Sequence, residues 1–142
     1  PLLVERLACQ DWPAGVDVLD LSAGAVHIVH ALQADEPYDA AIFVAAVRRG
    51  DPAGMVRCQP YVVPPAGDDE VQNRIAEAIT GVIGLDVLLT ILHHFDALPP
   101  RVTVIEIEPR DENWGPAISP PVEAAFDVAA ALVRREVREF LG

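Results

Sequence analysis

Two glutamates near the end of an apolar run are the side chains of this sequence best placed for acid–base chemistry. Glu106 and Glu108 are two residues apart in the run Arg101–Glu108, which follows a pair of prolines. Alternate residues of a strand point to one face, so both carboxylates are expected on the same face near the carboxyl end, where open α/β sheets hold their ligands. Such a pair could act as general acid and base. Anchoring of a loop and exposure to solvent are the alternatives.

Histidines are the other candidate ligands. His93 and His94 stand close to Asp96 and could form a metal-binding cluster with it. The alternative is that they end a helix, where imidazoles favourably face the helix dipole and the solvent. His27 and His30 are three residues apart, a spacing that puts both on one helix face, where they could share a metal. No third ligand is in view for this pair, and a solvated helix face is the alternative.

Charge excludes one class of partner. The chain has 142 residues and a formal net charge of −12, and all 10 of its basic residues are arginine. Nucleic acid is not expected as a partner, because binding a phosphate backbone requires clustered positive charge. Arg48 and Arg49 are interpreted as solvated turn residues, with contact to an acidic partner as the alternative. A membrane is not expected either, since no apolar run reaches the roughly 18 to 20 residues of a membrane span.

Several reaction classes lack their motifs. The sequence contains no Gly-x-Ser-x-Gly elbow, no P-loop and no Gly-x-Gly-x-x-Gly fingerprint. Cys58 has no neighbouring base, and together with Cys9 it lacks the spacing of a metal site. Both cysteines are therefore predicted to be buried thiols in a reducing compartment. The acidic composition, with no visible targeting signal, favours the cytoplasm.

The elements that must position these residues alternate between strands and helices. Strands are predicted at Val16–Asp20 and Asp39–Val47, the second fully buried, with a helix at Ala25–Gln33 between them. Val26, Val29 and Leu32 define the apolar face of that helix. This order is the unit of a parallel sheet covered on both faces. Gly54–Tyr61 is predicted to add a strand near an edge, where Pro60 is tolerated.

The second half continues the pattern. A polar linker, Pro64–Glu70, leads into a helical segment, Val71–Phe95, which is interrupted at Gly81 and Gly84 and deeply buried after that point. The last helix is predicted to follow Ser119 as its N-cap, with Pro120 at its first position. Residues 1–142 are expected to form one domain, an α/β fold of the phosphorylase/hydrolase-like type: a three-layer α/β/α sandwich around a mostly parallel mixed sheet.

One stretch combines a strand, a glycine-bearing loop and a capped helix start. Val104-Ile105-Glu106-Ile107-Glu108-Pro109 runs through Trp114-Gly115 into Ile118-Ser119-Pro120-Pro121-Val122. This stretch resembles the hydrogenase maturation endopeptidases, in which a strand closing in Ile-Glu-Pro precedes a short glycine loop and Leu-Ser-Pro-x-Val. Val44-Ala45-Ala46-Val47 and the turn after it resemble the family's buried strand, and Pro1–Leu7 resembles its first helix.

The resemblance implies an activity and a partner. Members of the family bind the nickel-loaded large-subunit precursor of nickel-iron hydrogenase and remove its C-terminal extension. The nickel belongs to the substrate, and no cofactor is retained. Two carboxylates and one imidazole are thought to recognise the nickel, but at two of these three positions this chain has Ala45 and Gly81, which offer no ligand. His93 lies 12 residues beyond Gly81, or about 18 Å along a continuous helix, which is too far to replace the imidazole.

Three further positions follow from the resemblance. Asp20 stands where the family has a turn resembling Asp-Gly-Gly-Thr, and it is a possible substrate contact, with a helix N-cap as the alternative. Gly84 and Glu108 are possible substrate contacts as well. The family's opening strand, which ends in Gly-x-Gly-Asn, and its acidic loop are expected to be missing before Pro1. One edge of the sheet would then be unpaired.

Three functions stay open from the sequence. The first is that of a hydrogenase maturation endopeptidase. The second is a non-catalytic binding protein for a hydrogenase subunit or another protein, which Ala45 and Gly81 favour. The third is a small-molecule or peptide binder of flavodoxin-like topology, for which the buried strands alone would suffice.

Overall fold

A β-sheet divides the molecule into two halves. The structure is a computed structural model that describes residues 2–22, 24–33, 36–65, 67–79, 84–110 and 118–142, and among these it has three strands in the order β1–β3–β2. The central strand β3 (Arg101–Ile107) is parallel to β1 (Ala40–Ala46) and antiparallel to β2 (Val56–Pro60). The predicted edge strand with Pro60 is confirmed.

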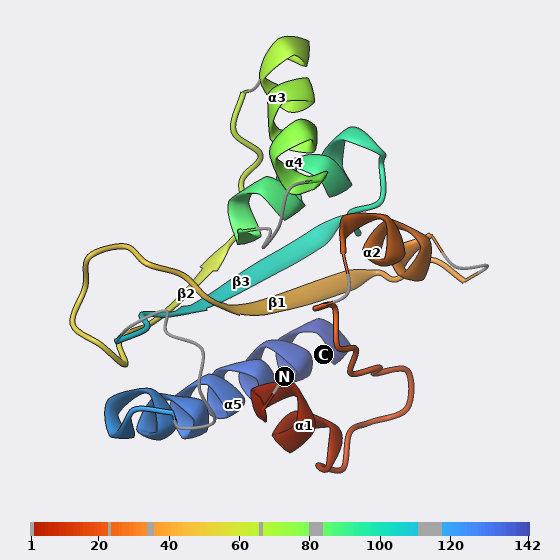
Figure 1. Cartoon of the computed structure of the whole chain (residues 1–142). Coiled ribbons are helices and arrows are strands. Elements are labelled where there is room, and N and C mark those ends of the chain that lie inside the picture. The colour runs from red at the N-terminus through yellow and green to blue at the C-terminus, as the bar shows by residue number, and fades with distance from the viewer. Residues whose placement is uncertain (1, 23, 34–35, 66, 80–83, 111–117) are drawn as a thin grey trace.

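Helices cover both faces of the sheet, which confirms the three-layer α/β/α prediction. Helices α1 (Leu2–Ala8) and α5 (Pro120–Leu141) lie against one face (Figure 1). On the other side are α2 (Ala25–Leu32), α4 (Leu85–His94) and, projecting beyond α4, α3 (Asp68–Ile79). No described helix is long and apolar enough to cross a membrane.

The sheet has a hydrophobic core on each face, and the central strand β3 contributes residues to both. Alternate residues of β3 point to opposite faces, and Ile105 (0% exposed) packs in the core with α5, whereas Val104 (3%) packs in the core with α2 and α4. Along α5, the apolar residues Phe126, Ala129 and Val133 recur at helical spacing and are buried. The amphipathic pattern of this helix therefore predicts its packing correctly.

Three local predictions are wrong. Val16–Asp20 forms no strand, although Val16 and Val18 still pack against the α5 side of the core. β1 is not fully buried, since only Phe43 is buried among its seven residues. The reason is its position: among the described residues, no strand pairs with the edge of β1 that faces away from β3. Val26 of α2 is 71% exposed, because this helix buries Ile28 and Leu32 instead.

Two further differences concern helix starts. α3 begins at Asp68, inside the predicted linker, because its acidic first turn suits the positive end of the helix dipole. Ser119 is the N-cap of α5 as predicted, but its hydroxyl makes no capping bond. Pro121 has no N–H to donate, and the N–H of Val122 is already bonded to the Ser119 carbonyl oxygen at 3.0 Å. The hydroxyl is therefore buried without a partner.

The cysteines also differ from the prediction. Both are free thiols, and Cys9 is exposed whereas Cys58 is partly buried. Burial and the nearby charge of Glu136 raise the pKa of the Cys58 thiol. Cys58 is therefore not a nucleophile activated by its surroundings.

Candidate functional site

The carboxyl ends of the parallel strands β1 and β3 bring two positions together. Ala45 and Glu106 are partners in the strand register. Paired residues of neighbouring strands share a face, and Ala45 packs in the core that includes residues of α2 and α4. Glu106 therefore points towards α4, and it is only 4% exposed. In open α/β sheets this end is the one that holds ligands.

Glu106 forms a cluster of ion pairs with Arg49 and Asp86. The guanidinium of Arg49 contacts Glu106 twice, with Nε donating to Oε2 at 3.1 Å and Nη2 donating to Oε1 at 2.6 Å. The same guanidinium reaches Asp86 in the first turn of α4, where Nη1 and Nη2 donate to the two carboxylate oxygens at 3.1 Å each. We call these three side chains the Arg49 cluster. Bidentate pairing of this kind is the strongest form of charge-assisted hydrogen bond.

Electrostatics stabilise the charged form of Arg49. Hydrogen bonds raise the pKa of Arg49 further above its ordinary value. The bond with Glu106 has the largest effect, and the bond with Asp86 the second largest. Exposure changes steeply across the cluster, because the side chain of Glu106 is 5% exposed, that of Arg49 35% and that of Asp86 56%. Arg49 is thus a paired residue between a buried and an exposed carboxylate, and its interpretation as a solvated turn residue is wrong.

Glu108 fixes the loop that carries Arg49. Its carboxylate accepts hydrogen bonds from the backbone N–H of Arg49 at 2.7 Å and of Gly50 at 3.3 Å. These backbone donors, that of Arg49 first, lower the pKa of Glu108, and the charge of Arg48 adds to the effect. Although Glu108 is only 5% exposed, its charge is therefore stabilised. Of the readings open from the sequence, loop anchoring is the one that these bonds describe.

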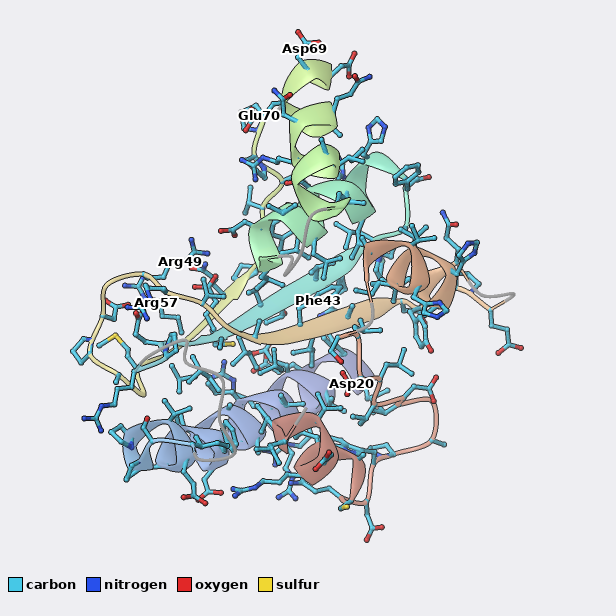
Figure 2. The ribbon with its side chains drawn as sticks, in the orientation of Figure 1. Asp20, Phe43, Arg49, Arg57, Asp69 and Glu70 are labelled. Carbon is cyan, nitrogen blue, oxygen red and sulfur yellow. The ribbon has the colours of Figure 1, made fainter. Side chains whose placement is uncertain are left out.

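The two glutamates are both engaged by the same loop. Glu106 binds the side chain of Arg49, and Glu108 binds its backbone. A general acid or base must present a free proton site to a substrate, whereas these carboxylates are occupied by donors within the chain. The arrangement organises the end of the sheet near the β1–β2 loop, where Figure 2 labels Arg49.

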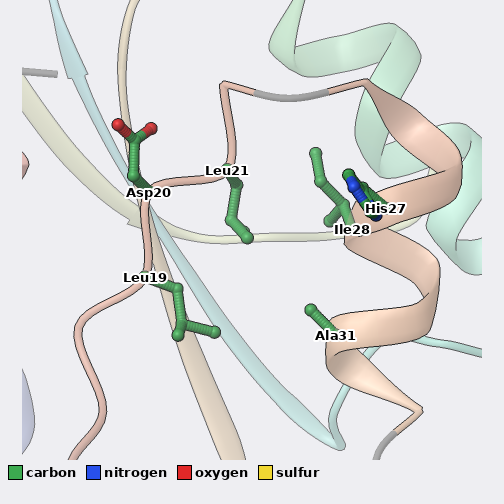
Figure 3. Close-up of a pocket in the computed structure, with 6 residues that line it drawn as sticks. All are labelled: Leu19, Asp20, Leu21, His27, Ile28 and Ala31. Carbon is green, nitrogen blue, oxygen red and sulfur yellow. The ribbon is translucent and has the colours of Figure 1, made fainter.

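Asp20 lies elsewhere. Its carboxylate accepts the backbone N–H of Ser22 at 3.0 Å, and hydrogen bonds from Ser22 lower the pKa of Asp20. It does not cap α2, whose N-cap is Gly24 without a side-chain bond. Figure 2 shows Asp20 well apart from Arg49. Asp20 instead lines a pocket of about 230 Å³ beside α2, with Leu19, Leu21, His27, Ile28 and Ala31 (Figure 3).

The other predicted site residues are distributed over α4. His93 and His94 are exposed in its last turn, as predicted for a helix C-terminus. Both line a cavity of about 500 Å³ that Tyr61 and Asp68 also line. Among the described residues, no three His, Cys, Asp or Glu side chains are placed to hold a metal ion, and this applies to the group with Asp96.

The glycines of the predicted site are at the other end of α4. Gly84 is exposed and is the N-cap of this helix, two residues before Asp86. Gly81 lies outside the described residues, as does the Trp114-Gly115 loop. Gly84 therefore stands close in the chain to the Arg49 cluster, whereas the histidines are a helix length away.

Sequence reasoning missed Arg49 and Asp86 as site residues. An arginine directly after the carboxyl end of a buried strand, and an acidic residue in the first turn of a helix, were the available signals. Neither shows which opposite charge it meets. The pairing depends on how α4 packs against β3, and a local sequence pattern does not show this tertiary packing.

Comparisons with known proteins show which solved structures share this fold. Neither a protein-family model nor a curated protein matches the chain. Among solved structures, the hydrogenase 2 maturation peptidase from Thaumarchaeota archaeon SCGC_AB-539-E09 aligns with 96% of this chain and 85% of its own, at 26% identity and a TM-score of 0.64. This chain therefore shares its α/β fold with a hydrogenase maturation peptidase.

Two structures from Escherichia coli share the fold. The hydrogenase maturating endopeptidase HybD has 21% identity and a TM-score of 0.65, and a further endopeptidase has 19% identity and a TM-score of 0.71. Each alignment covers 97% of this chain and 81% of the other. These similarities support the resemblance to hydrogenase maturation endopeptidases that the motifs around Glu108 and Ser119 predict.

Proposed function

We propose that this protein binds the C-terminal region of a hydrogenase large-subunit precursor at the carboxyl ends of β1 and β3. Similarity to hydrogenase maturation peptidases supports the kind of partner. The parallel pairing of β1 with β3 supports the proposed position, because ligands of open α/β sheets bind beyond the carboxyl ends of such strands. Asp20 and Gly84 are proposed as further contacts of this partner.

We further propose that binding occurs without cleavage. The observation that carries this proposal is the chemistry around Ala45: a methyl group stands beside Glu106, whose two oxygens are both engaged by Arg49. Recognition of nickel requires oxygen or nitrogen ligands, and neither Ala45 nor Gly81 supplies one. The residues of this chain therefore do not fit the metal-recognition step expected of a processing enzyme.

An endopeptidase that cleaves the precursor is the second candidate. It is favoured by the 26% identity with a hydrogenase 2 maturation peptidase over 96% of this chain. In that case the nickel of the precursor would be recognised by ligands other than Ala45 and Gly81. The two candidates differ in one product, the released C-terminal extension.

The experiment is an incubation of the purified protein with nickel-loaded large-subunit precursor, followed by intact mass and by native mass spectrometry of complexes. We expect a complex with a precursor of unchanged mass. A precursor that already lacks its extension is the matched control and should bind more weakly. Loss of the extension would establish the endopeptidase, and the absence of any complex would overturn the proposed function.

A further inference from the structure

We infer that the Arg49 guanidinium is a built-in cation that fills the space between β3 and α4 where a partner's divalent metal would be engaged, so that this chain binds its partner independently of metal. The inference rests on the proposed function for the identity of the partner. The occupation of the space by Arg49 is independent of it, and is tested separately below.

The first argument is the donor set. Oxygens of Glu106 and Asp86 converge on one nitrogen, because Nη2 of Arg49 donates to Glu106 at 2.6 Å and to Asp86 at 3.1 Å. Carboxylate oxygens from two elements that converge on a point are the ligands hard divalent cations take. Here the point of convergence is occupied by a nitrogen that carries positive charge. A guanidinium and a divalent ion cannot share that point, since like charges repel at such distances.

The second argument is location. Ala45 is the register partner of Glu106 on the face of the sheet towards α4, and Asp86 lies in the first turn of that helix, shortly after Gly81 in the chain. The Arg49 cluster therefore lies next to Ala45, and its Asp86 follows Gly81 by five residues in the chain. A site that lost its metal ligands and retained two carboxylates would carry uncompensated negative charge, and Arg49 compensates it.

The third argument is burial. Glu106 is almost fully buried, and a buried carboxylate needs a cation or a proton. Arg49 is held in place by more than this pair, because its own N–H donates to Glu108 at 2.7 Å. Its position is thus fixed from both backbone and side chain. Removing only the guanidinium would leave Glu106 and Asp86 to recruit another cation from solution.

This consequence can be measured with Mn²⁺ alone, a hard cation that prefers carboxylate oxygens over imidazole. We would titrate untagged wild type, Arg49→Met and Arg57→Met with Mn²⁺ near neutral pH and follow the free-ion electron paramagnetic resonance signal. Arg57 is the matched control, because it pairs with Asp51 at 2.6 Å in the same region but outside the cluster. We expect Arg49→Met to gain one site that binds at least tenfold more tightly than any site of the other two proteins.

A double variant identifies the ligands. In Arg49→Met/Asp86→Asn the gained site should be lost, because one of the two carboxylates is then an amide. Wild type that binds Mn²⁺ as tightly as Arg49→Met would overturn the inference, and so would a gained site that survives Asp86→Asn. If Arg49→Met does not fold, the wild-type protein still decides through the next measurement.

That measurement compares the affinity of wild type for nickel-loaded and metal-free precursor. We expect the two dissociation constants to agree within about twofold, whereas a preference above tenfold for the nickel-loaded form overturns the inference. If the protein binds neither form of the precursor, only the proposed partner is refuted. The occupation of the site by Arg49 is then decided by the Mn²⁺ titration. If Arg49→Met does not fold, Arg49→Gln replaces it in that titration.

Discussion

Arg49 joins three parts of the chain that lie far apart in the sequence. Its side chain bridges Glu106 at the end of β3 and Asp86 at the start of α4, and its backbone N–H binds Glu108. A buried ion pair is stable only when both partners are present and well oriented. Each charged group of this cluster is therefore compensated by a partner from another element: the β1–β2 loop, the end of β3 or the start of α4.

Glu108 should make the protein sensitive to acid. Its pKa in the folded protein lies below the ordinary 4.5, because backbone N–H groups, that of Arg49 first, stabilise the carboxylate. A lowered pKa gives stability that is complete above about pH 4.5 and is lost as the pH falls through the folded-state pKa. We expect Glu108→Gln to flatten this loss, as measured by urea unfolding at about pH 7 and about pH 3.5.

The control for this change is Glu5→Gln, which removes an exposed carboxylate of α1. It should leave the dependence of stability on pH as it is in wild type. An equally steep loss of stability in Glu108→Gln and wild type would contradict the assignment of acid sensitivity to Glu108.

Ser119 gives a prediction opposite to the one its sequence position suggests. An N-cap serine normally stabilises a protein by about 1 kcal/mol, but here the hydroxyl is buried without a partner. We expect Ser119→Ala to leave the free energy of unfolding unchanged or to raise it by up to about 1 kcal/mol. Thr103→Val is the comparison, since it removes a hydroxyl that donates to Glu136 at 3.2 Å, and should cost about 1 kcal/mol. A loss on Ser119→Ala as large as that on Thr103→Val would restore the capping role.

At the scale of elements, the β1–β2 loop is held against the start of α5. Gly54 has φ +85°, its N–H donates to the carbonyl oxygen of Glu108 at 2.8 Å, and a Cβ atom at this position would clash with the Pro121 carbonyl oxygen. Gly50 in the same loop has φ +86°, but a Cβ atom there meets open space. The loop thus contains two glycines with nearly the same positive φ angle but different surroundings.

These glycines separate backbone strain from packing. Gly50→Ala should cost about 1 kcal/mol for the left-handed conformation alone. Gly54→Ala should cost about 2 to 4 kcal/mol, because the clash adds to that strain. Chemical denaturation of both variants measures the difference, and equal losses would mean that α5 does not press against Gly54.

Sequence patterns predicted the elements well where periodicity and packing agree. β3 and α5 each have a strong apolar pattern, and β3 ends one residue before its predicted end while α5 begins at the predicted Pro120. The pattern failed at Val16–Asp20, whose alternation is real but which has no strand partner, because pairing is not a local property. The Glu106 and Glu108 pair was found from spacing alone, whereas their engagement by Arg49 depends on tertiary contacts that spacing does not encode.

At the scale of the whole molecule, two cores meet at β3. The core with α2 and α4 contains Leu92, which is 0% exposed, and Leu89, which is 1% exposed. A domain of this kind has a net stability of only about 5 to 15 kcal/mol. Loss of one large side chain from either core is therefore a large fraction of the total.

Leu92→Ala should lower the free energy of unfolding by about 2 to 5 kcal/mol, because it leaves a cavity that the neighbouring side chains fill only in part. Val62→Ala is the control, since Val62 is 78% exposed, and should change stability by no more than about 0.5 kcal/mol. Thermal unfolding followed by circular dichroism measures both. A loss below about 1 kcal/mol for Leu92→Ala would mean that this core is loosely packed.

The place of α5 in the chain affects how the protein is made. Every described strand precedes α5, yet Ile105 and Ile107 of β3 depend largely on that helix for cover. On a ribosome, the sheet therefore emerges with one apolar face covered only in part, by α1, until α5 follows. Chains that stop before Pro120 would keep that apolar surface uncovered and be prone to aggregate, so synthesis of α5 protects the sheet.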